Sequence, residues 1–127
     1  MRTVTVLLLA CTVSLVAASS QTPPPSPTLY AAVFKTGPKW DAGKAPGDQA
    51  FFREHSANLA RLRAAGTVII GARYADVGLI VVSASSEADA RKLFDADPSI
   101  AAGTFALDVH RFSVFYPGTV GNVTPVK

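Results

Sequence analysis

The sequence is poor in the residues that build cross-links and metal sites. Its 127 residues include one cysteine, Cys11, and two histidines, His55 and His110. Cys11 lies in an N-terminal segment that we expect to be removed, and its loss excludes disulfides and thiolate metal sites. Two histidines far apart in the chain are a poor metal set without cysteine. We therefore expect no metal ion and a fold held together by its apolar core alone.

Several catalytic motifs are also missing. The sequence has no glycine-rich phosphate loop, no Gly-x-Ser-x-Gly turn and no His-x-x-x-His pair. These absences argue against hydrolysis by an activated serine and against zinc chemistry, and we expect no cofactor. The charges are close to balance, with 12 Lys and Arg against 9 Asp and Glu. No basic stripe with interleaved aromatic residues appears, which argues against nucleic acid as a partner.

The N-terminus has the features of a signal peptide. Arg2 supplies a short positive region, and the run that follows it is largely apolar up to small residues at the end of segment 1–18. We predict cleavage near Ala18, an exported protein and no membrane span after cleavage. The run is shorter than the about 20 residues of a membrane-spanning helix. An alternative is a lipoprotein, because Leu8-Leu9-Ala10-Cys11 resembles a lipoprotein box that would place a lipid on Cys11.

The rest of the chain divides into three parts. Residues 19–28 are rich in proline and polar side chains, which predicts an extended linker. Residues 29–116 carry the predicted folded domain. Residues 117–127 contain proline and glycine and predict a flexible C-terminal tail.

Hydrophobic patterning within the domain predicts the order β-α-β-β-α-β. This is the split βαβ, or ferredoxin-like, arrangement, an α+β fold in which both helices cover one face of an antiparallel sheet. The strands are apolar on both faces, so we expect a second subunit to cover the other face in a homodimer. The predicted strands cover residues 29–35, 67–74, 77–83 and 104–115, and the predicted helices cover residues 48–65, with Asp48 as N-cap and Gly66 as C′ residue, and 87–96.

One face of the first predicted helix carries a histidine. Phe52, His55, Leu59 and Leu62 recur at helical spacing, so His55 belongs to the stripe that faces the core. Two interpretations stay open: a neutral core histidine, or a general acid and base beside a carboxylate. Burial disfavours the charged imidazole whereas a nearby carboxylate favours it. These opposing effects are expected to leave His55 titrating near neutrality, where proton transfer is efficient.

The junction after the second helix carries the candidate carboxylate. Pro98 moves Asp97 out of the α region into an extended conformation, so the helix should stop near Ala96. Small residues follow Pro98 and permit a close approach of other backbone or of a ligand. Asp97 is either a capping carboxylate forced by the proline or one half of a reactive pair, and the two roles are compatible.

Four further side chains are candidates for contacts with a ligand or a partner. Arg73 and Tyr74 lie near the hairpin tip and are either solvated turn residues or substrate contacts. Trp40 belongs to the irregular segment 36–47, which is either a lid over a pocket or a loop that covers the sheet end. Trp40 itself serves either packing or ligand stacking. His110 is expected at an interface or on the surface.

Three stretches of this sequence together resemble the YciI-like (YCII-related) family. They are GPKWDAGK after the first strand, REHSANLARLRAAGTVIIGARYAD across the first helix and the hairpin, and LFDADPSIAAGTFALDVHRF at the end. The resemblance covers residues 29–115. It implies a dimeric α+β barrel, with two ferredoxin-like sheets packed back to back, and it places the family's proposed His-Asp pair on His55 and Asp97. The predicted export signal departs from the commonest members.

The relatives that this resemblance implies include muconolactone isomerase-like proteins and a dehydrochlorinase of chlorinated hydroxyquinols. Two hypotheses follow. In the first, the chain is a cofactor-independent isomerase, lyase or dehalogenase that moves protons on a small cyclic or aromatic substrate, with His55 as acid and base and Asp97 as its partner. In the second, it is a non-catalytic domain that binds a small apolar or anionic ligand, or only forms a stable dimer.

Overall fold

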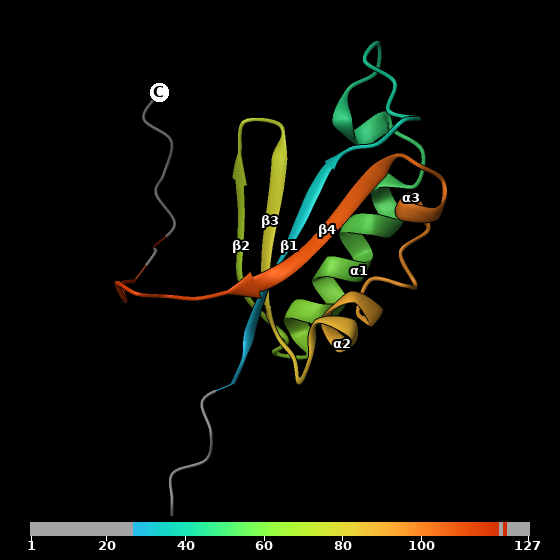
Figure 1. Cartoon of the computed structure of the whole chain (residues 1–127). Helices are drawn as coiled ribbons and strands as arrows, with labels where there is room; N and C mark the ends of the chain where they lie inside the picture. Colours follow the sequence, from blue (N-terminus) through green and yellow to red (C-terminus); the bar gives the residue numbers. More distant parts are fainter. Residues whose placement is uncertain (1–26, 120, 122–127) are drawn as a thin grey trace, which may run out of the picture.

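The computed structural model describes residues 27–119 and 121, and in this part of the chain four strands form one antiparallel sheet with helices on one of its faces (Figure 1). The order in the sheet is β2-β3-β1-β4. The elements are β1 (Leu29–Thr36), the 3-10 turn η1 (Pro46–Asp48), α1 (Phe52–Ala64), β2 (Val68–Tyr74), β3 (Val77–Ser83), α2 (Glu87–Lys92), α3 (Pro98–Ala101) and β4 (Phe105–Phe112).

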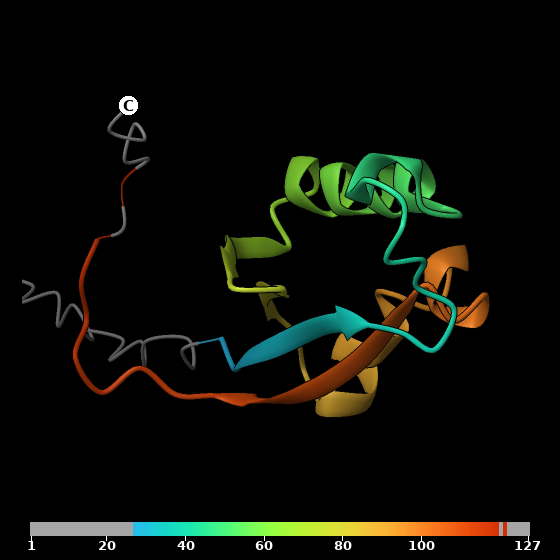
Figure 2. The ribbon, with the colours of Figure 1, turned by 90° about the horizontal axis from the view of Figure 1, so that it is seen from above.

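This topology confirms the predicted α+β fold and is consistent with a ferredoxin-like arrangement. The first strand, β1, lies between β3 and β4 and pairs antiparallel with both. The hairpin of β2 and β3 turns at residues 75–76 as predicted, with Ala75 in a left-handed conformation. Seen from above, the sheet curves, and α1 (green) lies opposite β1 (blue) and β4 (orange-red) (Figure 2). The predicted signal peptide, Cys11 and residues 19–26 of the linker lie outside the described residues.

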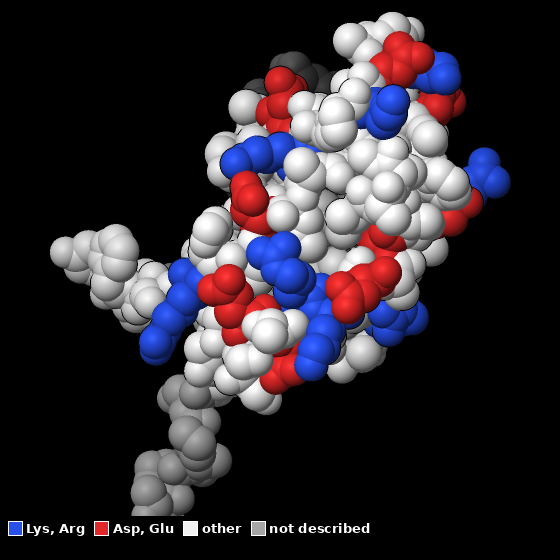
Figure 3. Space-filling view, turned by 45° about the vertical axis from the view of Figure 1, so that its right-hand side comes forward, with Lys and Arg blue, Asp and Glu red and all other residues white. Residues whose placement is uncertain are grey.

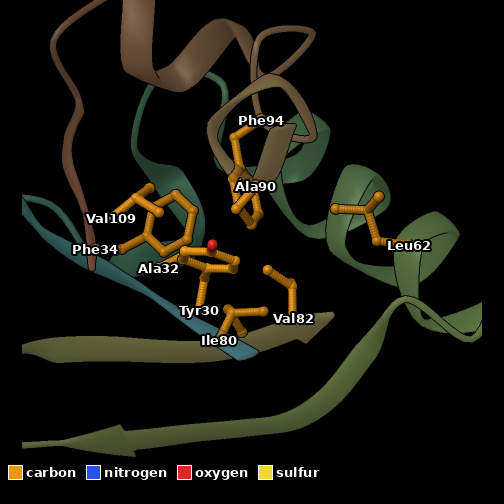
Figure 4. Packing of buried hydrophobic residues seen from close by; sticks show 9 residues of the cluster. All are labelled: Tyr30, Ala32, Phe34, Leu62, Ile80, Val82, Ala90, Phe94 and Val109. Carbon is orange, nitrogen blue, oxygen red and sulfur yellow. The ribbon is translucent and has the colours of Figure 1, made fainter. Parts of the chain in front are cut away.

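The core fills the space between the sheet and the helices. Alternate residues of β1, β3 and β4 point into it and meet α1, α2 and the turn after α2 (Figure 4). Burying these apolar side chains is the main stabilising contribution in a fold of this size. None of the helices in the described part of the chain is long and apolar enough to span a membrane. The core side chains are Tyr30, Ala32, Phe34, Leu62, Ile80, Val82, Ala90, Phe94 and Val109.

The first helix begins at Phe52, so the prediction that Asp48 caps it is wrong. Asp48 instead ends η1, and Phe51 precedes the helix with a left-handed backbone (φ 60°). The buried Gln49 explains this late start of the helix, because its side-chain amide forms hydrogen bonds with the backbone of the preceding loop. The predicted end is confirmed. Gly66 has φ 74° and donates its N–H to the Arg63 carbonyl at 3.0 Å, which closes the helix.

The second predicted helix is shorter than its pattern suggested. Ser86 caps α2 by accepting the Asp89 N–H at 3.1 Å, but the regular helix ends at Lys92 and turns lead to Asp97. A separate short helix, α3, which was not predicted, starts at Pro98. Proline suits the first helical position because its missing N–H has no partner there in any case. Similarly, β4 ends at Phe112 although the alternating pattern runs on to residue 115.

Backbone hydrogen bonds tie the loop after β1 to the start of β4. The Gly37 N–H donates to the Thr104 carbonyl and the Lys39 N–H donates to the Gly103 carbonyl, each at 2.8 Å. A Cβ atom on Gly37 would clash with the backbone carbonyl of Gly103. This close approach therefore requires glycine at position 37. The two hydrogen bonds hold the start of the loop after β1 in place.

We expect Gly37→Ala to lower the free energy of unfolding by about 1–3 kcal/mol, because the added methyl group forces the two backbones apart. Gly47→Ala is the matched control, since a Cβ atom at Gly47 would meet no atom within 4 Å. Urea unfolding of the two variants and the wild type measures the difference. Equal losses in the two variants would contradict the close approach.

Candidate functional site

The fold brings His55 and Asp97 into direct contact. Nδ1 of His55, on the inner face of α1, lies 2.6 Å from Oδ2 of Asp97, at the junction before α3. Both side chains are buried, with 7% of His55 and 1% of Asp97 exposed. The two residues are 42 positions apart in the chain. The same carboxylate caps α3 by accepting the Ser99 N–H, so the predicted capping role of Asp97 is confirmed.

Asp97 is held by Ser99 as well as by the histidine. The Ser99 N–H donates to Oδ1 of Asp97 at 3.0 Å, and the Ser99 hydroxyl donates to the same oxygen at 2.6 Å. Burial by itself would raise the pKa of Asp97, but the hydrogen bonds from His55 and Ser99 outweigh it and hold the pKa below its usual range. Asp97 is therefore a carboxylate at neutral pH.

The charge of Asp97 decides which nitrogen of a neutral His55 carries the proton. A carboxylate only accepts hydrogen bonds, so Nδ1 must be the protonated, donating nitrogen. Nε2 then carries the free lone pair. Among the described residues Nε2 forms no side-chain hydrogen bond, and the buried unpartnered atoms there are Asn58 Nδ2 and Thr104 Oγ1. The lone pair of Nε2 is thus not engaged by another side chain in this part of the chain.

Aromatic rings fix the plane of the imidazole. Phe34 of β1 meets His55 edge to face at 4.8 Å between ring centroids, and Phe105 of β4 packs against it at 4.6 Å. Phe52, one turn earlier on α1, lies at 6.4 Å. Edge-to-face and tilted contacts of this kind are favourable between aromatic rings. They leave the imidazole little freedom to turn away from Asp97.

His55 forms part of the wall of a cavity of about 570 Å³ between α1, the inner face of the sheet and the loop after β1. This volume lies within the range of small-molecule sites. Most lining side chains are apolar or aromatic, and the charged ones are Arg73 and Asp76. The lining residues are Phe34, Thr36, Trp40, Ala42, Pro46, Phe52, His55, Ser56, Leu59, Ala72, Arg73, Asp76, Gly78, Ile80 and Phe105.

The loop after β1 closes one side of this cavity. Trp40, Ala42 and Pro46 of the loop contribute to the lining, and Trp40 also packs on Phe105 with ring centroids 5.5 Å apart. Gln49 holds the loop in shape, because its amide donates to the Asp41 carbonyl at 2.6 Å and accepts the Asp41 N–H at 2.9 Å. The segment thus forms a wall of the cavity and does more than cover the end of the sheet.

The structure places the other predicted site residues on different surfaces. Trp40 and Arg73 line the same cavity as His55. Tyr74 does not line it. The residue is 58% exposed and follows Arg73 in β2, so its side chain points to the opposite face of the sheet. His110 is exposed on that same outer face, paired with Ala31.

Sequence reasoning did not assign Ser99, Phe34 and Phe105 to the site. The signal for Ser99 was available, since an N-cap aspartate accepts hydrogen bonds from residues two or three positions later. No sequence signal marks the two phenylalanines as walls around a histidine, because they look like ordinary core residues. Within the described residues, no group of three or more His, Cys, Asp or Glu side chains could hold a metal ion.

Comparison of the sequence with models of known protein families and with curated proteins found no match. The site is thus defined by its geometry: a buried ionised carboxylate, an imidazole oriented by it, and an apolar cavity beside them.

The lowered pKa of Asp97 predicts how stability depends on pH. An unfolded aspartate titrates at about 3.9, so the stabilising carboxylate is fully present above that pH and is lost as the pH falls through the lower folded value. Asp97→Asn should therefore cost about 1.5–3 kcal/mol at neutral pH. This deficit relative to the wild type should shrink as the medium is acidified below about pH 4.

Urea unfolding across this pH range measures the deficit. Asp95→Asn is the matched control, because Asp95 is exposed and two residues away. It should differ little from the wild type at any pH. A deficit in Asp97→Asn that stays constant on acidification would show that the carboxylate is not held in its ionised form.

Proposed function

We propose that this protein is a cofactor-independent enzyme of the isomerase or lyase type, in which His55 transfers a proton on a small cyclic or aromatic substrate. The observation that carries the proposal is the 2.6 Å contact between His55 Nδ1 and Asp97 Oδ2, in a histidine that lines a cavity. A histidine oriented in this way has the arrangement of a general base.

The chemistry requires only the groups of the chain and the substrate. Nε2 of His55 accepts a proton from an acidic C–H or O–H of the substrate, and the electron pair of that bond forms a new double bond. Asp97 stabilises the imidazolium that results. The imidazolium then returns the proton to a different atom of the substrate, which completes an isomerisation. Alternatively, the electron pair expels a leaving group that takes up the proton from His55, which completes an elimination. General acid–base catalysis of this kind contributes about 10²–10⁴-fold in rate.

The lining of the cavity supports a flat and largely apolar substrate. Phe34, Trp40, Phe52 and Phe105 offer ring faces or edges to a bound molecule. Aromatic side chains pack favourably against other flat rings. A volume of about 570 Å³ accommodates a small cyclic molecule.

The family and the location of the protein are part of the same proposal. We place the chain in the YciI-like family because its sequence stretches resemble that family, and the fold and the His55–Asp97 contact agree with what the resemblance implies. We also propose that the protein is exported, on the evidence of its segment 1–18.

Deuterium exchange tests the proposed activity. Thermal-shift screening first selects binders from a panel of cyclic ketones and hydroxylated aromatic compounds, because a ligand at 100 times its Kd adds about 2.7 kcal/mol of stability. Incorporation of deuterium from D2O into each binder is then followed by NMR. His55→Gln should lower the exchange rate by about 10²–10⁴-fold and leave binding within a few-fold.

His110→Gln is the matched control, since it removes the other histidine, which is exposed on the outer face of the sheet. It should exchange at the wild-type rate. Binding without any exchange in the wild type would support the alternative, a domain that binds a small ligand without catalysis. Equal rates in His55→Gln and the wild type would exclude His55 as the base.

We further propose that two copies of the chain pair through the outer face of the sheet. Residues of β1 and β3 that alternate with the core residues are apolar on this face. Val33 and Leu79 are half-buried in the single chain, whereas Ala31 and Val81 are already buried in it. Soluble proteins seldom leave a large apolar sheet face in water. A second copy of the same face would cover it.

Sedimentation of the cleaved protein should therefore show a dimer, and Leu79→Glu should shift it to a monomer by placing a charge in the paired face. The matched control is Ala57→Glu, which adds the same charge at an exposed position of α1. A wild-type monomer would contradict the paired sheets, and so would a dimer that Leu79→Glu leaves intact.

A further inference from the structure

We infer that the cavity selects a ring compound that carries a single negative charge in a carboxylate, with Arg73 as the residue that binds this group. The inference deepens the proposed function by naming the class of substrate. The claim that the bound molecule is a substrate rests on the proposed function, whereas the claim that Arg73 binds a carboxylate rests on the cavity alone.

Arg73 reaches the cavity because of its position in the β2–β3 register. It pairs with Gly78 of β3, and the next pair on the same face of the sheet joins Gly71 to Ile80, a core residue. Arg73 therefore projects from the face that α1 covers. Gly78 also lines the cavity and has no side chain, so the strand position paired with Arg73 adds no side chain to this part of the lining.

The guanidinium of Arg73 has no anionic partner in residues 27–119 and 121. It forms no salt bridge within 4.0 Å and no side-chain hydrogen bond there, although Asp76 lines the same cavity. The remaining carboxylate of the site, Asp97, is engaged by His55 and Ser99. Arg73 is thus available to bind an anion that enters the cavity.

The charges that line the cavity favour a carboxylate over a phosphate. A guanidinium binds either group through two parallel hydrogen bonds. However, a phosphate monoester carries about −1.5 to −2 charges at neutral pH, whereas the lining supplies one positive side chain and, in Asp76, a negative one. A monoanion can pair with Arg73 and is repelled by Asp76 less strongly than a dianion is.

Arg73 and His55 line the same cavity from different elements and can contact different parts of one molecule. Arg73 belongs to the sheet and His55 to the helix above it, and the rings of Phe52 and Phe105 lie 6.3 Å apart in the same lining. A ligand with its carboxylate on Arg73 places its ring among these aromatic side chains. In this proposal Arg73 is the specificity-determining residue that binds the carboxylate, and His55 is the base that acts on the ring.

Calorimetric titration with benzoate, benzamide and phenyl phosphate tests the selectivity. Benzoate should bind more tightly than benzamide, which has the same shape without the charge, and more tightly than phenyl phosphate. Arg73→Gln should weaken benzoate binding by roughly 10- to 100-fold, because a hydrogen-bonded charge pair is lost. The same change should leave benzamide binding within about two-fold. Arg73→Lys should give an intermediate loss, since it keeps the charge but not the two-pronged geometry.

Two further variants separate this effect from a general change in charge. Arg53→Gln removes an exposed arginine of α1 that does not line the cavity, and it should leave benzoate binding unchanged. Asp76→Asn removes the negative charge of the lining and should tighten benzoate binding by a few-fold. Equal binding of benzoate and benzamide, or benzoate binding that survives Arg73→Gln, would overturn the inference.

The outcome is independent of whether the protein catalyses proton transfer. Arg73-dependent benzoate binding without deuterium exchange into any bound ring compound would support the binding site and remove the proposed catalysis. Exchange that depends on His55 but shows no preference for carboxylates would support the proposed catalysis and remove the carboxylate site at Arg73.

On the face shown in Figure 3, positive and negative side chains are interspersed, so that face offers no broad basic surface to compete for the anion.

Discussion

The site depends on one buried carboxylate and the groups that keep it charged. Asp97 receives hydrogen bonds from the Ser99 N–H, the Ser99 hydroxyl and Nδ1 of His55, and these outweigh the cost of its burial. An unpaired charge at such a depth would be neutralised or would destabilise the fold. Because Asp97 stays ionised, it sets the tautomer of His55 and leaves Nε2 free. The same carboxylate also caps α3, so the local backbone and the site share a single interaction.

The side chains and the loop around His55 and Asp97 are held in place by packing and hydrogen bonds, and they leave a cavity beside His55. Phe34 and Phe105 hold the imidazole from the sheet side, and Gln49 together with the Gly37 contact to β4 holds the loop that carries Trp40. The walls of the cavity therefore belong to regular strands and to a loop that hydrogen bonds hold in one conformation. Preorganised walls of this kind reduce the conformational entropy that binding a small molecule would otherwise cost.

Sequence patterns predicted the presence of the helices and strands better than the residues at which they begin and end. The helical stripe that contains His55, the C-terminal glycine of α1 and the β2–β3 hairpin are confirmed, because each depends on local spacing or backbone conformation. The start of α1 and the existence of α3 were missed. The start of α1 depends on the hydrogen bonds between Gln49 and the preceding loop, which compete with the helical pattern. The helix α3 depends on the N-cap bond that Asp97 accepts from Ser99.

The sequence by itself determined that His55 faces the core and that Asp97 leaves the helix before Pro98. These are properties of helical periodicity and of proline stereochemistry, and they hold for any packing of the chain. Only the tertiary structure decided that the two side chains meet across 42 residues, that Arg73 shares their cavity and that Tyr74 faces the other way. Such contacts depend on how the helix lies across the sheet and on strand register, where a shift of one residue exchanges the two faces.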